Sequence, residues 1–410
     1  MKQTLLFIGH HFHCHTKSIS FLLELIEKKF EAEYCYCHID PFNDEDNTWQ
    51  TSIQRKHYDV VLCLQVMPSI EKLKQHCSFD FGVFFPMADY YYRAQKDVSA
   101  PIWQEYQDFQ IISFSRKMHE ELIAHGFSSH YFQYFPEPAP MFKPGDTDSV
   151  FFWQRVTHIN VYSILSLLKN YNIRHLHIHK AIDPCETYIP LPYEYQGMMK
   201  VSYSSWFERK DDMLKFMDES ALYVAARYCE GIGMSFLEAM AHGRCVIAPD
   251  ETTFNEYIKD GKNGFLFIPS NPLPLKTADI REIQKNAYEF IRDGYRKWCI
   301  KREKIVPLFT RKAEINLKKI QDLESIWCQH KKGTSVKDAV VSQNFANHLF
   351  ARIKKYINIF QNKACNYTCK EEKKFCAIRW LLKMERNDKR KILIFFLGLP
   401  LFSVDIIEEN

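Results

Sequence analysis

The sequence predicts an α/β protein with two successive parallel sheets and a basic C-terminal appendage. Short apolar runs alternate with amphipathic segments along the first 330 residues, which is the pattern of a parallel sheet covered by helices on both faces. A proline-rich stretch at 134–149 interrupts the alternation, as an interdomain linker does. Residues 351–391 differ from the rest, because they hold thirteen Lys or Arg against four Asp or Glu.

The overall composition restricts the class of protein. The chain has 410 residues, of which 46% are hydrophobic and 25% charged, so it is long enough for two or three domains and is not disordered throughout. Its thirteen cysteines are scattered, which favours a reducing cytosol over a disulfide framework. No apolar run reaches the ~20 residues of a membrane-spanning helix. The N-terminal segment predicts a first strand rather than a signal peptide.

The first domain is expected at residues 1–145. Apolar side chains recur at helical spacing in 18–30, and a second helix is expected at 116–127, ended by Gly126. Buried strands are expected from the apolar runs at 4–9, 32–39, 59–66, 81–87 and 110–115.

The second domain is expected at residues 146–330, as another Rossmann-like series. Strands are predicted at 149–156, 175–182, 221–227, 245–250 and 264–268. Helices are predicted at 160–172, 207–220 and 235–242, followed by a long charged helical stretch from 279 to 330. Ligands of such sheets bind at the carboxyl ends of the strands, so two halves joined by a hinge predict a site in a cleft between them.

The most informative stretch runs from 227 to 243, where a strand end, a glycine-containing loop and a helix start follow one another. The free amides and the dipole at a helix N-terminus favour a phosphate. Glu230 precedes the helix and Glu238 lies about one turn inside it, so the two carboxylates can accept hydrogen bonds from different parts of a ligand. The dinucleotide-binding fingerprint begins similarly, but Phe236 stands at its third glycine, so a nicotinamide enzyme is disfavoured.

This stretch resembles the donor-binding motif of retaining GT-B-fold glycosyltransferases of family 4. The likeness is carried by EGIGMSFLEAMAHGRCVIA, starting at Glu230, and by FNEYIKDGKNGFLF, starting at Phe254. It implies the GT-B fold, two Rossmann-like domains facing a central cleft. It also implies a nucleoside-diphosphate sugar as donor, transfer with retention, and no metal or other cofactor.

The resemblance also implies roles for individual residues. Glu238 is expected to hold the ribose hydroxyls, Glu230 to contact the donor sugar, and Arg155 to bind the diphosphate. Asn160 stands where the family usually has Lys, and Arg209 or Lys210 are candidates to replace that Lys. The expected donor-binding residues are Gly9, Glu230, Gly231, Ile232, Gly233, Met234, Ser235 and Glu238. The expected catalytic residues are Glu230, Arg155, His13 and Asp89.

Four histidines lie within residues 10–15, directly after the first predicted strand. A metal site is one interpretation, but the dense spacing and the metal independence of the fold disfavour it. A cleft-facing histidine that binds donor or acceptor is favoured, and His13 and His15 are the candidates. Asp89 ends another predicted strand, where it is either an acceptor-side base or a loop-capping residue.

The C-terminal appendage is expected at 331–410, with apolar residues at helical spacing among its basic ones. One interpretation places residues 351–402 on an anionic membrane surface, and the apolar faces favour it. The other is a solvated helical hairpin that packs against protein. Nucleic acid is not expected as a partner, because no binding module accompanies the charge.

Together these features predict a cytoplasmic glycosyltransferase, peripheral on the inner face of the cell membrane. It would move a hexose-type sugar from a nucleotide-sugar to a hydroxyl of a growing, lipid-linked glycan, as in capsule or lipopolysaccharide assembly. The alternative, supported by Asn160, is a catalytically degenerate GT-B protein that binds a nucleotide-sugar or a partner transferase. The sequence does not predict the nucleobase, the sugar, the acceptor or the linkage.

Overall fold

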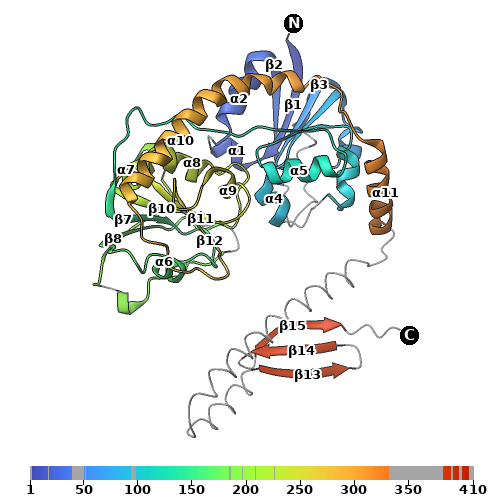
Figure 1. Ribbon diagram of the computed structural model, residues 1–410. Helices are drawn as coiled ribbons and strands as arrows, with labels where there is room; N and C mark the ends of the chain where they lie inside the picture. The colour runs from blue at the N-terminus through green and yellow to red at the C-terminus, as the bar shows by residue number, and fades with distance from the viewer. Residues whose placement is uncertain are drawn as a thin grey trace. The chain divides into compact units, whose positions relative to one another are not determined.

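The structure is a computed structural model, and it divides into two units, residues 1–333 and 334–410 (Figure 1). It describes residues 2–16, 18–38, 50, 52–93, 98–183, 186–195, 197–207, 209–225, 227–331, 382–388, 391–396 and 399–405.

The first domain is a six-stranded sheet in the order β2-β1-β3-β4-β5-β6, and all neighbouring strands are parallel. The strands are β1 (Gln3–His10), β2 (Phe30–Cys37), β3 (His57–Leu64), β4 (Ser78–Phe85), β5 (Gln110–Ser113) and β6 (Ser129–Tyr131). The helices are α1 (Phe12–His15), α2 (Ser20–Lys29), α3 (Ile70–Leu73), α4 (Ala88–Arg93), the 3₁₀ helix η2 (Pro101–Tyr106) and α5 (Arg116–Ala124). The central strands are buried apolar runs, which is why they form a sheet covered on both faces.

The second domain is a parallel six-stranded sheet in the order β12-β11-β10-β7-β8-β9. The strands are β7 (Asp146–Trp153), β8 (His175–His179), β9 (Lys200–Ser204), β10 (Ser220–Val224), β11 (Cys245–Pro249) and β12 (Phe265–Phe267). The helices are α6 (Val161–Leu167), η3 (Tyr193–Tyr195), α7 (Lys210–Glu219), α8 (Met234–Ala241) and α9 (Phe254–Tyr257). This strand order is that of a Rossmann domain, and it reverses between β7 and β10.

The predicted fold class is therefore confirmed: two Rossmann-like domains follow one another, as the GT-B architecture requires. The predicted strands and helices differ from the observed ones by a few residues at their ends. Strands β6 and β9 were not predicted. Both are short sheet edges, and β9 has no buried residue, so neither has the apolar run by which the other strands were recognised.

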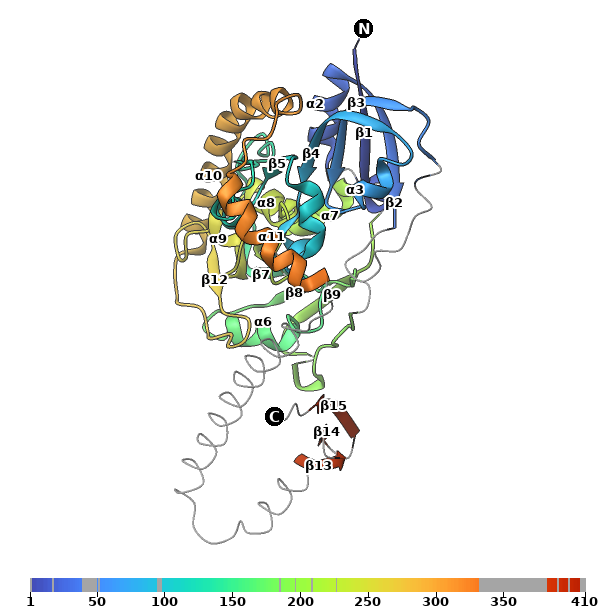
Figure 2. The ribbon, with the colours of Figure 1, turned by 90° about the vertical axis from the view of Figure 1, so that its right-hand side faces the viewer.

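The helical stretch expected at 279–330 is two helices, α10 (Ile280–Lys301) and α11 (Leu317–Lys331). The 3₁₀ turns η4 (Arg302–Lys304) and η5 (Val306–Leu308) separate them. Helix α10 leaves the second domain and reaches α2 (Figure 1). There Trp298 lies edge-on to Phe21, with ring centroids 5.7 Å apart. Helix α11 packs on the first domain (Figures 1 and 2). Its Trp327 is fully buried, and the indole N–H donates to the carbonyl of Val98 at 3.0 Å. The expected domain 146–330 included α11, whose Trp327 contacts Val98 and Phe127 of the first domain.

A carboxylate joins the two domains at the start of α5. Glu256, in α9 of the second domain, accepts hydrogen bonds from the backbone N–H of Arg116 (2.8 Å), the hydroxyl of Tyr131 (2.9 Å) and the hydroxyl of Ser115 (3.1 Å). The carboxylate thus satisfies a free amide in the first turn of a helix that belongs to the other domain. Such an acceptor is stabilised by the helix dipole as well as by the hydrogen bonds.

The C-terminal unit contains an antiparallel sheet of β13 (Leu382–Asp388), β14 (Lys391–Phe396) and β15 (Leu399–Asp405). The prediction of a helical appendage is wrong over these strands, because the apolar residues at 392–396 and 399–402 lie in strands that pair through their backbones. The remainder of that prediction, at 332–381, 389–390, 397–398 and 406–410, lies outside the described residues. Within the described part of the chain, the helices are too short or too polar to cross a membrane.

Replacing Glu256 by Ala is expected to lower the melting temperature by about 3 °C or more, because several donors of the first domain lose their charged acceptor. Glu120→Ala is the matched control, since Glu120 is an exposed residue of α5 itself, and it should change the melting temperature by less than about 1 °C. Equal effects of the two substitutions would contradict the role of Glu256.

Candidate functional site

The strand order of the second sheet marks where a ligand is expected. In open α/β sheets, ligands bind outside the carboxyl ends of the strands at the point where the strand order reverses. Here that point lies between β7 and β10, which are hydrogen-bonded neighbours. Arg155 follows β7 and Arg227 follows β10, so two guanidinium groups come from the two strands that flank the reversal.

A single carboxylate holds these two guanidinium groups together. Asp183, which follows β8, accepts from Nε of Arg155 at 2.9 Å through one oxygen. Its other oxygen accepts from Nε of Arg227 at 2.9 Å and lies 2.7 Å from the Nη2 atom. Burial alone would raise the pKa of Asp183, but the two arginines lower it below its ordinary value. The carboxylate is thus ionised and cancels part of the repulsion between the two cations.

Two further carboxylates contact Arg227. Its Nη1 atom donates to Asp89 Oδ2 at 3.0 Å and lies 3.6 Å from Glu230 Oε2. Burial raises the pKa of Glu230, and the carboxylates of Asp89 and Asp183 act in the same direction, against the two arginines. Glu230 is therefore held closer to its neutral form than a carboxyl group in water.

The loop after Glu230 is shaped by its glycines. Gly233 has a φ of 80° and precedes the first residue of α8, a left-handed conformation that favours glycine. A Cβ atom at Gly231 would lie 2.8 Å from Asp89 Oδ1 and 2.9 Å from the side chain of Met87. The loop therefore lies directly against the first domain. Ile232 is buried, while Met234 and Ser235 begin α8 half-buried.

Tyr223, buried in β10, lies beside several of the predicted donor-binding residues. Burial raises the pKa of Tyr223; a side-chain hydrogen bond with Ser235 opposes the rise, and the charges of Glu230, Arg155 and Glu238 act on it as well. Glu238 itself is half-buried in α8. The residues that the motif proposed are thus brought together around one strand end.

In the first domain, two polar residues meet after the carboxyl ends of the neighbouring strands β1 and β3: His13 follows β1, and Gln65 follows β3. His13 Nε2 lies 3.1 Å from Gln65 Oε1, and burial lowers the pKa of His13. Gly9, an expected donor-binding residue at the end of the predicted strand 4–9, lies inside β1 opposite Tyr36 and Leu64. The strand continues one residue beyond its predicted end, to His10. Nothing is described of the side chain of His15.

Two residues with positive φ angles contact predicted site residues. Among the described non-glycine residues, positive φ values occur at Gln65 (67°) and Thr253 (72°). Gln65 contacts His13, and the hydroxyl of Thr253 donates to the backbone carbonyl of Glu230. A β-branched residue at positive φ is a genuine outlier, and such strain is concentrated at functional sites.

The side chain of Asn160 has a local structural role. Its Oδ1 atom accepts from the backbone N–H of Tyr162 at 3.0 Å, and its Nδ2 atom donates to the carbonyl of Thr157 at 2.8 Å. Asn160 is therefore the N-cap of α6. Arg209, expected as a substitute cation, is exposed and lies 3.6 Å from Asp211. The side chain of Lys210 is not among those described.

Arg227 and Asp183 belong to this candidate site, and the sequence did not predict either of them. Both residues follow strands that neighbour β7 in the sheet. A charged residue shortly after a predicted strand was therefore the sequence feature that could have indicated them. Without the strand order, however, residues 44 positions apart in sequence could not be recognised as partners.

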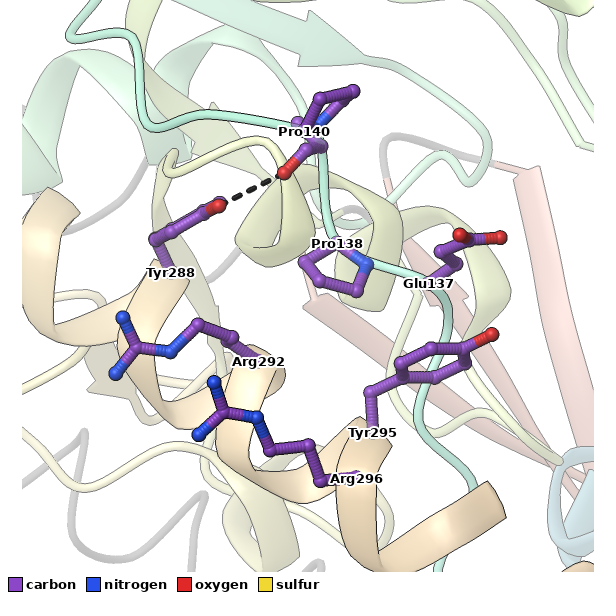
Figure 3. A pocket seen from close by; sticks show the side chains of 8 residues that line it. Glu137, Pro138, Pro140, Tyr288, Arg292, Tyr295 and Arg296 are labelled. Atoms are coloured by element: carbon purple, nitrogen blue, oxygen red, sulfur yellow. Dashed lines mark hydrogen bonds between the residues drawn. The ribbon is translucent and has the colours of Figure 1, made fainter.

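The structure also contains a cavity of about 260 Å³ in another place, between the linker and α10 (Figure 3). Glu137 and Pro138 face Tyr288, Arg292 and Tyr295 across it, and the hydroxyl of Tyr288 donates to the carbonyl of Ala139 at 2.8 Å. None of the predicted site residues lines this cavity. The better candidate site is therefore the group of charged residues at the strand ends, which we call the charge cluster: Arg155, Asp183, Arg227, Asp89 and Glu230.

Comparison with known families supports the same region. Residues 198–297 match the family model described as glycosyl transferases group 1. The match includes β10, the glycine loop and α8. Comparison with curated proteins gives no match.

Solved structures show weak overall likenesses at low identity. The lipopolysaccharide outer core galactosyltransferase WaaB is 14% identical, over 73% of this chain and 99% of that one, with a TM-score of 0.43. Anabaena Alr3699/HepE in complex with UDP and glucose is 12% identical, over 81% and 99%, with a TM-score of 0.42. Sucrose-phosphate synthase from Thermosynechococcus elongatus is 13% identical, over 84% and 100%, with a TM-score of 0.48.

Replacing Glu230 by Gln is expected to raise the melting temperature of the ligand-free protein at pH 8 and to have less effect at pH 4. A carboxyl whose pKa is raised by folding costs stability above that pKa, and the cost disappears once the folded and unfolded forms are both protonated. Thermal unfolding across this pH range measures the difference. A gain that grows toward low pH would contradict a raised pKa.

Proposed function

We propose that the protein is a glycosyltransferase that moves a hexose-type sugar from a nucleoside-diphosphate sugar to a hydroxyl of a growing glycan. The observation that carries the proposal is the charge cluster at the carboxyl ends of β7, β8 and β10, directly beside the glycine loop. Two half-buried arginines, Arg155 and Arg227, lie near a glycine loop and a helix N-terminus. Such a combination suits a diphosphate. The match of residues 198–297 to group 1 glycosyl transferases supports the reaction class.

In this proposal the donor lies along the loop from Glu230 to Ser235. The diphosphate contacts the loop amides and Arg155. Glu238 accepts hydrogen bonds from the ribose hydroxyls, and Glu230 contacts hydroxyls of the donor sugar. Carboxylates suit both roles, because they are strong acceptors for paired hydroxyl donors.

The chemistry breaks the bond between the anomeric carbon and the diphosphate oxygen and forms one to the acceptor oxygen. Negative charge develops on the leaving diphosphate, where fixed amides, the α8 dipole and guanidinium groups stabilise it. The acceptor hydroxyl loses its proton, and the leaving phosphate oxygen is one base placed to take it. Transfer then proceeds with retention, and no protein nucleophile is assigned. These groups supply the positive charge without a metal ion or other cofactor.

His13 and Asp89 lie on the first domain and are proposed to act on the acceptor side. His13 is half-buried, and burial lowers its pKa, so it is neutral near pH 7 and can accept a proton or a hydrogen bond. The basic stretch at 351–391 supports a lipid-linked acceptor at an anionic membrane surface, contacted through 351–402. The corresponding location is the cytoplasmic face of the cell membrane.

A second candidate is a degenerate protein that binds a nucleotide-sugar, or a partner transferase, without turnover. Asn160 favours the degenerate protein. It stands at the position where a Lys is expected, and its neutral side chain hydrogen-bonds to the backbone of Thr157 and Tyr162 rather than facing a ligand as a cation. A donor-hydrolysis assay separates the candidates. Release of nucleoside diphosphate from a donor that binds supports the enzyme, whereas binding without release over many hours supports the degenerate protein.

Replacing Glu238 by Ala is expected to abolish donor binding, because the ribose loses its carboxylate acceptor. Thermal shift with UDP-, GDP-, ADP- and CMP-sugars measures this, since a ligand that binds only the folded state raises the melting temperature. The wild type should respond to one nucleotide class, and Glu238→Ala should lose at least ~90% of that shift at the same concentration.

The matched control is Glu219→Ala, an exposed acidic residue at the end of α7 in the same domain. It should bind donor as the wild type does. Unchanged donor binding or turnover in Glu238→Ala would refute the proposed site.

A further inference from the structure

Arg227 stands out because it reaches both domains. Its Nη1 atom donates to Asp89 of α4 in the first domain, while Nη2 and Nε contact Asp183 of the second. The side chains of Arg227 and Asp89 are each 19% exposed. An ion pair so protected from water is screened far less than a surface pair.

The carboxylate of Asp89 lies between Arg227 and the glycine loop. One oxygen, Oδ2, accepts from Arg227 at 3.0 Å, and the other, Oδ1, lies 2.8 Å from where a Cβ of Gly231 would be. A glycine backbone on one side and a guanidinium on the other are the surroundings that a phosphate oxygen takes in a protein. A carboxylate of the first domain therefore sits where an anionic ligand of the second domain would bind.

Residues nearby make a second cation necessary for such a ligand. Arg155 and Arg227 both direct their Nε and Nη2 atoms to Asp183, so neither cation alone offers its full charge to a diphosphate. The side chain of Asn160 is neutral and caps α6. Of the described residues in this cluster, Arg227 is the further cation.

We propose that Arg227 binds the diphosphate of the donor, and that Asp89 occupies this anion position in the ligand-free protein. The proposal rests on the proposed function for the identity of the ligand. Binding exchanges one anion for another at Arg227: the Asp89 carboxylate leaves and a phosphate oxygen takes its place. Because Asp89 belongs to the other domain, the exchange also releases one of the contacts that join the domains.

The consequence is that Asp89 is an intramolecular competitor of the ligand. Removing its charge should strengthen binding of a diphosphate, even though a contact seen in the structure is weakened. A purely structural role for Asp89, as an acidic residue in the first turn of α4, predicts a change in stability and no gain in affinity.

The experiment measures binding of inorganic pyrophosphate, and of UDP, GDP and ADP, by calorimetry on the full chain. Asp89→Asn is expected to bind pyrophosphate on the order of tenfold more tightly than the wild type. Arg227→Gln is expected to bind it on the order of tenfold more weakly. Asp80→Asn is the control for a lost negative charge, because Asp80 is an exposed residue of β4 that pairs with His57.

The double variant Asp89→Asn/Arg227→Gln makes the test specific. If Asp89 competes for Arg227, its removal strengthens binding only when Arg227 is present, so the gain should vanish in the double variant. A gain of the same size in both backgrounds, or in Asp80→Asn, would mean a general charge effect and would overturn the proposal. Asp89→Asn keeps the size of the side chain and an oxygen that can accept from Arg227, so its comparison with Asp80→Asn still tests the proposal if Arg227→Gln does not fold.

The outcomes also separate this proposal from the proposed function. If a nucleoside diphosphate binds with an affinity independent of Asp89 and Arg227, the proposed function stands and this inference is overturned. If neither pyrophosphate nor any nucleoside diphosphate binds to the wild type or to Asp89→Asn, both are overturned.

Discussion

The candidate site depends on one buried carboxylate that lets two arginines lie side by side. Without Asp183, the guanidinium groups of Arg155 and Arg227 would repel one another at the ends of adjacent strands. Asp183 is 6% exposed and offers one oxygen to each of them. Asp183 therefore holds both guanidinium groups beside the glycine loop. The loop lies at the carboxyl ends of the parallel strands, where ligands of such sheets bind.

The same region holds the domains together, and this connects binding to domain contact. Glu256 accepts from the first turn of α5, and Asp89 accepts from Arg227, so each domain contributes a carboxylate to a positive group of the other. The first contact includes none of the residues around Arg227, whereas the second is made by Arg227 itself. A ligand that takes over Arg227 would loosen the second contact and leave the first intact, along with the packing of α10 on α2. Binding and movement between domains are coupled whenever they compete for the same group.

Much of the fold followed from local patterns, but the site followed only in part. Buried apolar runs and helical spacing predicted the central strands and main helices, because burial selects for those patterns. The motif located Glu230, Glu238 and the glycine loop. It could not reveal Asp183 or Arg227, because their partnership depends on β8, β7 and β10 being neighbours in the sheet. The strands β13, β14 and β15 were expected as helix, since short apolar runs do not distinguish strand from helix by spacing alone.

The most direct test is a crystal structure with the nucleoside diphosphate that binds best. We expect phosphate oxygens within hydrogen-bonding distance of the backbone amides of the 231–235 loop and of Arg227, with the Asp89 carboxylate displaced from Arg227. A bound nucleotide elsewhere, such as the cavity between the linker and α10, or an Arg227–Asp89 pair that persists beside bound phosphate, would contradict it.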